Sequence, residues 1–175
     1  MLGEDDQHLR FARHALLGLA FHTREIRCLF LPAGRGAGDQ YVRAHYAAEV
    51  REHRRKASSQ QVALFVLTDA DTQPVEHRFA QLAGVLQEAE LAARKDREAI
   101  IIWVPKRNIE TWVTYLAGQT VNEGDDFKRA GASLDVRASA ERFALLIQDA
   151  TQRRDDTPPS MARAFDEAKR LPRRK

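Results

Sequence analysis

The sequence predicts an α/β fold in which a parallel sheet lies between layers of helices. Two uninterrupted apolar runs, 62–67 and 99–104, indicate strands that are covered on both faces, as strands of parallel sheets are. Segments with helical spacing separate these runs, and such alternation is typical of βα units with right-handed crossovers. A length of 175 residues, of which 43% are hydrophobic and 30% charged, suits a globular domain.

The first third of the chain predicts two helices with a short strand between them. A first helix is expected over about 5–19, where apolar residues recur every three or four positions behind the acidic stretch 4–6. Residues 25–31 predict a strand, which Pro32 and a glycine-rich turn close. Asp39 suits the cap of a second helix.

The middle of the chain predicts the centre of the sheet. Residues 62–67 are expected to form its central strand, and Pro74 begins the helix that follows. Residues 99–104 predict the neighbouring strand. Asn108 caps the next helix, and Gly118 lies just beyond that helix's end.

The last forty residues or so predict a helical extension. We expect a three-layer α/β domain over 1–135 and, packed on it, an extension over 136–175 with helices at about 138–152 and 159–171. Residues 153–175 carry eight Lys or Arg and four Asp or Glu. This basic tail suits either a solvated helix end or an arm that contacts phosphates.

Composition excludes several classes of protein. No apolar run is long enough to span a bilayer, and the N-terminus is acidic where a signal peptide would be basic and then apolar, so a cytoplasmic protein is expected. The single cysteine, Cys28, allows neither a disulfide framework nor a thiolate zinc cluster, and its apolar neighbours predict a core position. A net charge of +3 is too small to indicate nucleic-acid binding by itself.

Two acidic residues directly follow the predicted central strand. Side chains alternate along an extended chain, so Asp69 and Asp71 are expected to project the same way while Ala70 points into the fold. Ligands of open parallel sheets bind beyond the carboxyl ends of the strands. Paired carboxylates there suit Mg²⁺ or Mn²⁺, although an acidic turn that caps a helix has the same pattern.

A second group of charges follows the neighbouring strand, in the segment PKRNIETW. Glu110 lies near a helix N-terminus beside Lys106 and Arg107, which suits either a functional acid or an ordinary first-turn carboxylate with solvated bases. The acidic residues 4–6 could reach the same sheet edge or merely suit a helix dipole.

Two other features are weaker signals. The turn GRGAG resembles a phosphate cradle, because glycines expose backbone N–H groups before a helix, but it lacks the ending and spacing of known nucleotide-binding loops. The six histidines are scattered, with His14, His45 and His53 on polar helix faces. We expect all six at the surface.

Five segments together resemble one protein group. In order along the chain they are GEDDQHLRFARHALLGLAF, FLPAGRGAGDQYV, LFVLTDADTQ, VPKRNIETWVTYLAGQTVNE and PPSMARAFDEAKRL. They resemble bacterial Toprim-like proteins, a family that includes domains of primases, topoisomerases and nucleases related to the OLD proteins. The resemblance implies a Rossmann-like parallel sheet flanked by helices.

The resemblance also implies roles for particular residues. The family's shared glutamate falls on Glu4, with Asp5 as a near rival, and its DxD motif falls on Asp69 and Asp71. The IETW segment implies that Glu110 supports the metal site or binds a second metal. One departure is that only three residues precede Glu4, where the family has a full strand.

The leading hypothesis is a metal-dependent nuclease that acts on DNA or RNA, in a phage-defence or mobile-element setting implied by the resemblance alone. Mg²⁺ or Mn²⁺ on Asp69 and Asp71 would activate water, and Glu4 would bind a second metal or act as general base. The phosphate would be neutralised by Arg35, Lys106 and Arg107.

Two alternatives belong to other classes. The first is a catalytically weak Toprim-like binding module that holds a partner ATPase or a nucleic acid. The second is a nucleotide-phosphate transferase that uses the GRGAG turn. The sequence is compatible with a homodimer and does not fix the oligomeric state.

Overall fold

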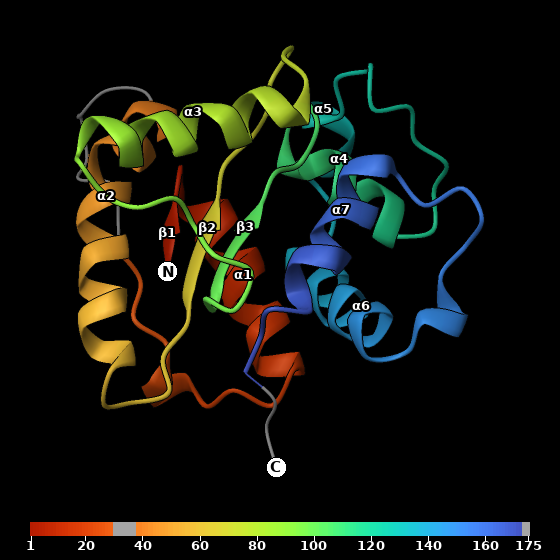
Figure 1. Ribbon diagram of the computed structural model, residues 1–175. Helices are drawn as coiled ribbons and strands as arrows, with labels where there is room; N and C mark the ends of the chain where they lie inside the picture. The colour runs from red at the N-terminus through yellow and green to blue at the C-terminus, as the bar shows by residue number, and fades with distance from the viewer. Residues whose placement is uncertain (30–37, 173–175) are drawn as a thin grey trace.

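The computed structural model describes residues 1–29 and 38–172, and within them a three-stranded parallel sheet lies among helices (Figure 1). The strands are β1 (Leu2–Gly3), β2 (Leu64–Leu67) and β3 (Ile100–Trp103), in the spatial order β1-β2-β3. The 62–67 run therefore supplies the central strand, as its composition predicts. The α/β class is confirmed at this level.

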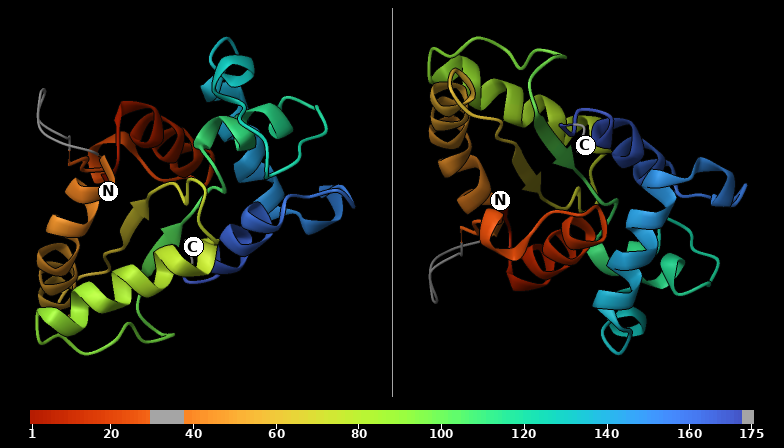
Figure 2. Two further views of the ribbon diagram at one scale, coloured as in Figure 1. Left: turned by 90° about the horizontal axis from the view of Figure 1, so that it is seen from above. Right: turned by 90° about the horizontal axis from the view of Figure 1, so that it is seen from below.

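Helices cover both faces of the sheet. Residues of β2 alternate between two apolar clusters: Leu64 and Val66 pack with α2 and α3, while Phe65 and Leu67 pack with α1 and the C-terminal helices. Figure 2 shows α1 and α3 on opposite sides of the strands. The first three helices are α1 (Asp6–Gly18), α2 (Gly38–Ala57) and α3 (Val75–Glu88).

The C-terminal helices gather beside β3, on the far side of the sheet from α2 (Figure 1). An aromatic cluster lies among them, in which Phe143 contacts Phe11, Trp103, Trp112 and Phe165. These helices are α4 (Ile109–Leu116), α5 (Lys128–Gly131), α6 (Val136–Gln148) and α7 (Pro159–Ala168), and two short 3-10 turns, Thr23–Glu25 and Ala150–Gln152, complete the described elements.

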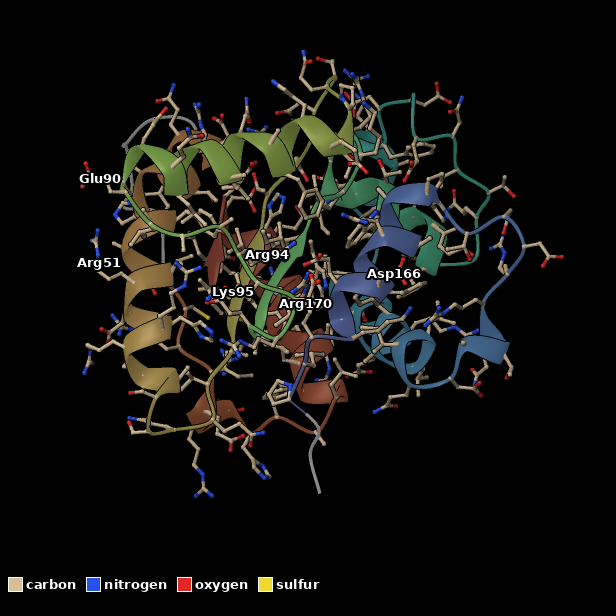
Figure 3. The ribbon with its side chains drawn as sticks, viewed as in Figure 1. Arg51, Glu90, Arg94, Lys95, Asp166 and Arg170 are labelled. Atoms are coloured by element: carbon tan, nitrogen blue, oxygen red, sulfur yellow. The ribbon has the colours of Figure 1, made fainter. Side chains whose placement is uncertain are left out.

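A buried carboxylate links helix α7 to the edge of β3 that pairs with no other strand among the described residues. Glu167 accepts the Ile102 N–H, which an edge strand would otherwise leave unpaired, and it also accepts two hydrogen bonds from Arg94. Arg94, in the segment before β3, and Arg170, just beyond α7, both face Glu167 (Figure 3). Arg170 donates to the Lys95 and Asp96 carbonyls, so the segment before β3 is held as well.

Most bases of the predicted tail that the structure describes are engaged within the fold. Arg153 stacks over Phe165 and donates to the Leu146 carbonyl, while Arg154 lies over Tyr115. Neither the solvated helix end nor the phosphate-contacting arm that the sequence suggests includes these contacts, and the choice between the two stays open. Residues 173–175 lie outside the described residues.

Several expectations need correction. The predicted strand at 25–31 is wrong over its described part, because residues 23–25 form a 3-10 turn and only Leu29 makes a bridge, to Leu2. The neighbouring strand β1 is only two residues long, so it offers few backbone groups with which the described part of 25–31 could pair. Cys28, expected in the core, is only partly buried. The predicted helix at 138–152 ends at Gln148, where Asp149 starts a separate 3-10 turn.

None of the helices among the described residues is both long enough and apolar enough to cross a bilayer.

Candidate metal centre

A group of polar side chains meets where β1 and β2 end. Gly3 pairs with Leu67, so the residues that follow the two parallel strands are neighbours. Glu4 follows β1, and its carboxylate accepts hydrogen bonds from the Thr68 hydroxyl and, at 3.1 Å, from the Asp69 N–H. The carboxyl end of the sheet thus brings Glu4 and Asp69 together, as expected for ligands at this edge.

His8 completes the group from the first turn of α1. Its ring is 2% exposed, with Nδ1 at 2.7 Å from an Asp5 carboxylate oxygen and Nε2 at 2.9 Å from Asp69 Oδ1. Asp5 is also the N-cap of α1 and accepts the His8 N–H. Both ring nitrogens therefore face carboxylates, and the expectation that all histidines lie at the surface is wrong for His8 and also for the buried His53.

The donor atoms of Glu4, His8 and Asp69 can converge on one cation. One ligand atom from each residue lies within 4.8 Å of the other two. Two carboxylates and an imidazole are a donor set that divalent first-row metals accept. Little water screens the charges of the two neighbouring carboxylates, so they repel each other strongly when both are ionised. A cation between them would relieve this repulsion.

Burial also alters the protonation of the centre. Loss of solvent raises the pKa of Glu4 to about 7, with Asp69 adding to the effect. Burial likewise raises the pKa of Asp69. Burial alone would lower the pKa of His8, but the carboxylates of Asp69 and Asp5 raise it well above its ordinary value. The metal-free centre therefore retains protons that a cation would replace.

Glu110 lies beside this centre, in the first turn of α4. It is half-buried, and burial together with the nearby Asp69 charge raises the pKa of its carboxyl. Glu110 and Glu4 each lie closely against a glycine: a Cβ on Gly131 would come within 2.4 Å of the Glu110 Cβ, and one on Gly38 within 2.5 Å of the Glu4 carbonyl oxygen.

The second acid of the DxD motif does not join the group. Asp71 has φ 53°, which breaks the strand-like alternation, and its side chain is 63% exposed, facing Arg78 on α3 at 3.3 Å. Ala70 is fully buried, as predicted. Arg78 also donates to the Asp69 carbonyl at 2.8 Å and so holds the loop that carries both aspartates. A role for Asp71 as metal ligand stays a prediction.

The predicted phosphate-binding residues have different positions. Lys106 follows β3 and donates to the Thr72 and Gln73 carbonyls, at 3.2 and 2.5 Å. Arg107 forms a backbone bridge with Asp71, and its Nε is buried without a hydrogen-bond partner among the described residues. Both therefore belong to the sheet edge that carries the centre. Arg35 and most of the GRGAG turn lie outside the described residues.

Sequence reasoning missed His8 and Arg78, although a signal for each was present. His8 precedes Phe11 and Ala15 by three and seven positions, the spacing of one helix face, and both of those residues are fully buried. Arg78 precedes the buried Leu82 by four positions. A polar residue on the apolar face of a helix is buried when that face packs, and burial is unfavourable unless the side chain forms hydrogen bonds.

A comparison with known protein families, curated proteins and solved structures finds no match for this chain.

Proposed function

We propose that this protein is a metal-dependent nuclease of Toprim-like fold, which hydrolyses phosphodiester bonds of DNA or RNA. The observation that carries the proposal is the convergence of Glu4 and Asp69 at the carboxyl ends of adjacent parallel strands. It is strengthened by the resemblance of the flanking segments to Toprim-like proteins. Bound Mg²⁺ or Mn²⁺ would polarise a phosphoryl oxygen and lower the pKa of an attacking water.

The chain's own residues would divide the remaining tasks. Glu4 and Asp69 would hold the cation, and the Thr68 hydroxyl and the Asp69 N–H orient the Glu4 carboxylate. Glu110, half-buried with a raised pKa, suits a group that accepts a proton from water. Arg107 follows β3 at the same sheet edge, and its guanidinium would supply positive charge for a phosphate oxygen.

A cleavage assay tests the proposal directly. Plasmid, single-stranded DNA and RNA are each incubated with the protein in Mg²⁺, in Mn²⁺ and in EDTA. We expect cleavage of at least one nucleic acid with a metal and none in EDTA. Intact substrates under every metal condition, or cleavage that EDTA leaves unchanged, contradict a metal-dependent nuclease.

The alternative is a binding module that holds a partner ATPase or a nucleic acid without catalysis. One observation favours it: His8 already bridges Asp5 and Asp69, so the centre is closed by hydrogen bonds without a cation. Such a module predicts a melting temperature that does not respond to millimolar Mg²⁺ or Mn²⁺. A nuclease centre predicts a rise in melting temperature, because the cation binds only the folded chain.

Replacing Glu4 by Gln is expected to stabilise the metal-free protein at pH 8. The pKa of Glu4 is raised to about 7 by burial, so the native state holds this proton more tightly than the unfolded chain does. The resulting stability is complete below about pH 4.5 and is lost as the pH rises through about 7. The Glu4→Gln variant, uncharged at every pH, lacks this loss, which we expect to be of the order of 2 kcal/mol.

Urea unfolding at pH 5 and pH 8, in EDTA, measures this difference. The matched control is Glu141→Gln, an exposed acid on α6. A Glu4→Gln variant that is less stable than the wild type at pH 8 would show that the carboxylate is held for structure rather than for a cation.

A further inference from the structure

We propose that His8 is the third protein ligand of this centre, through Nε2, and that the site therefore prefers a first-row transition metal such as Mn²⁺ to Mg²⁺. This inference rests on the proposed metal centre and specifies its ion. It begins from the position of the His8 ring, which is buried and lies between the carboxylates of Asp5 and Asp69.

The two ring nitrogens have different surroundings. Nδ1 faces Asp5, the N-cap of α1, at 2.7 Å, and the cap geometry fixes that carboxylate. Metal-binding histidines usually donate the other ring N–H to a carboxylate or carbonyl, which fixes the tautomer and the direction of the ligating lone pair. Once the proton shared by Nε2 and Asp69 has left, His8 keeps its Nδ1 proton toward Asp5 and presents the Nε2 lone pair on the side of Asp69.

The spacing of the donor atoms suits ligands that are adjacent around one ion. Two ligands at right angles, each about 2.1 Å from a cation, are about 3.0 Å apart. His8 Nε2 and Asp69 Oδ1 are 2.9 Å apart, which matches the separation of two adjacent ligands of one ion, so a cation bound by both atoms would replace the proton that they share. That proton leaves to solvent when the cation binds.

The mixed donor set decides the class of metal. Mg²⁺ favours oxygen ligands and keeps several waters, whereas an imidazole nitrogen suits Zn²⁺, Fe²⁺ or Ni²⁺ best. Mn²⁺ also favours oxygen ligands, but as a first-row transition metal it accepts an imidazole more readily than Mg²⁺ does. A centre with one nitrogen and two carboxylate oxygens should therefore bind Mn²⁺ more tightly than Mg²⁺. The pair Asp69 and Asp71 alone would offer oxygen ligands only.

Pulsed electron paramagnetic resonance of Mn²⁺ bound to the full chain tests the inference without any activity assay. We expect the electron spin-echo modulation of a directly bound imidazole ¹⁴N in the wild type, altered when the protein contains ¹⁵N-histidine. The modulation should be lost in His8→Gln and retained in His14→Gln, a control on the same helix. Bound Mn²⁺ without nitrogen modulation, or modulation that survives in His8→Gln, overturns the proposal.

The Asp5→Asn variant keeps the test valid if His8→Gln does not fold, because Asn caps a helix as well as Asp does. We expect its Mn²⁺ affinity to fall about 10- to 100-fold, which is the usual effect of removing a carboxylate that is hydrogen-bonded to a metal-binding histidine. Unchanged affinity contradicts the role of Asp5. Nitrogen-coordinated Mn²⁺ without nucleic-acid cleavage would refute the nuclease and leave His8 as a metal ligand. Mg²⁺-driven cleavage with no nitrogen modulation would support the nuclease and refute His8 as a ligand.

Discussion

Replacing Asp69 by Asn should lower the rate of nucleic-acid cleavage about a thousandfold. The substitution keeps the size of the side chain but removes one of the two carboxylates that would hold the cation. Metal-ion catalysis contributes several kcal/mol of transition-state stabilisation, and a loss of about 4 kcal/mol corresponds to this factor. The measurement is the initial rate of cleavage in Mn²⁺ under identical conditions for the two proteins.

Asp166→Asn is the matched control, since Asp166 is an exposed acid on α7 that pairs only with Lys169 among the described residues. It should cleave at the wild-type rate. A cleavage rate for Asp69→Asn within tenfold of the wild-type rate would exclude Asp69 as a ligand of the catalytic metal and leave the exposed Asp71 as the candidate.

Replacing Glu167 by Ala should destabilise the fold by about 3 to 5 kcal/mol. The substitution leaves the partly buried Arg94 guanidinium without its carboxylate and the buried Ile102 N–H without an acceptor. Breaking a buried ion pair from one side typically has a cost of this size. The measurement is the free energy of unfolding in urea.

Glu141→Ala provides the comparison, because Glu141 pairs with Arg137 on the solvent face of α6. Exposed pairs of this kind contribute about 0.5 kcal/mol or less. A Glu167→Ala variant as stable as Glu141→Ala would show that α7 is held by its apolar contacts alone.

Much of the fold could be predicted because its signals are local. The apolar runs at 62–67 and 99–104 contain β2 and β3, and Asn108 caps α4 as expected, its side chain accepting the Thr111 N–H. Two-residue β1 could not be predicted, because two residues carry no period and the strand exists only through its pairing with β2. The strand predicted at 25–31 also depended on a partner strand, and the neighbouring β1 is too short to provide one.

The candidate site was predicted in part, for a similar reason. Asp69 and Glu110 follow strong strand signals, so their place at the sheet edge is a local property of the chain. His8 reaches Asp69 from 61 residues away, and that contact depends on how α1 packs against β2. Asp71 departs from the expected direction because of one left-handed backbone angle, which composition does not reveal for an aspartate.

Calorimetric titration of Mn²⁺ into the metal-free wild type, Asp69→Asn and Asp166→Asn tests the central claim most directly, namely that Glu4 and Asp69 hold a divalent cation. We expect saturable binding to the wild type and to Asp166→Asn, and an affinity at least about tenfold lower in Asp69→Asn. No binding to the wild type, or equal affinity in all three proteins, contradicts the metal centre.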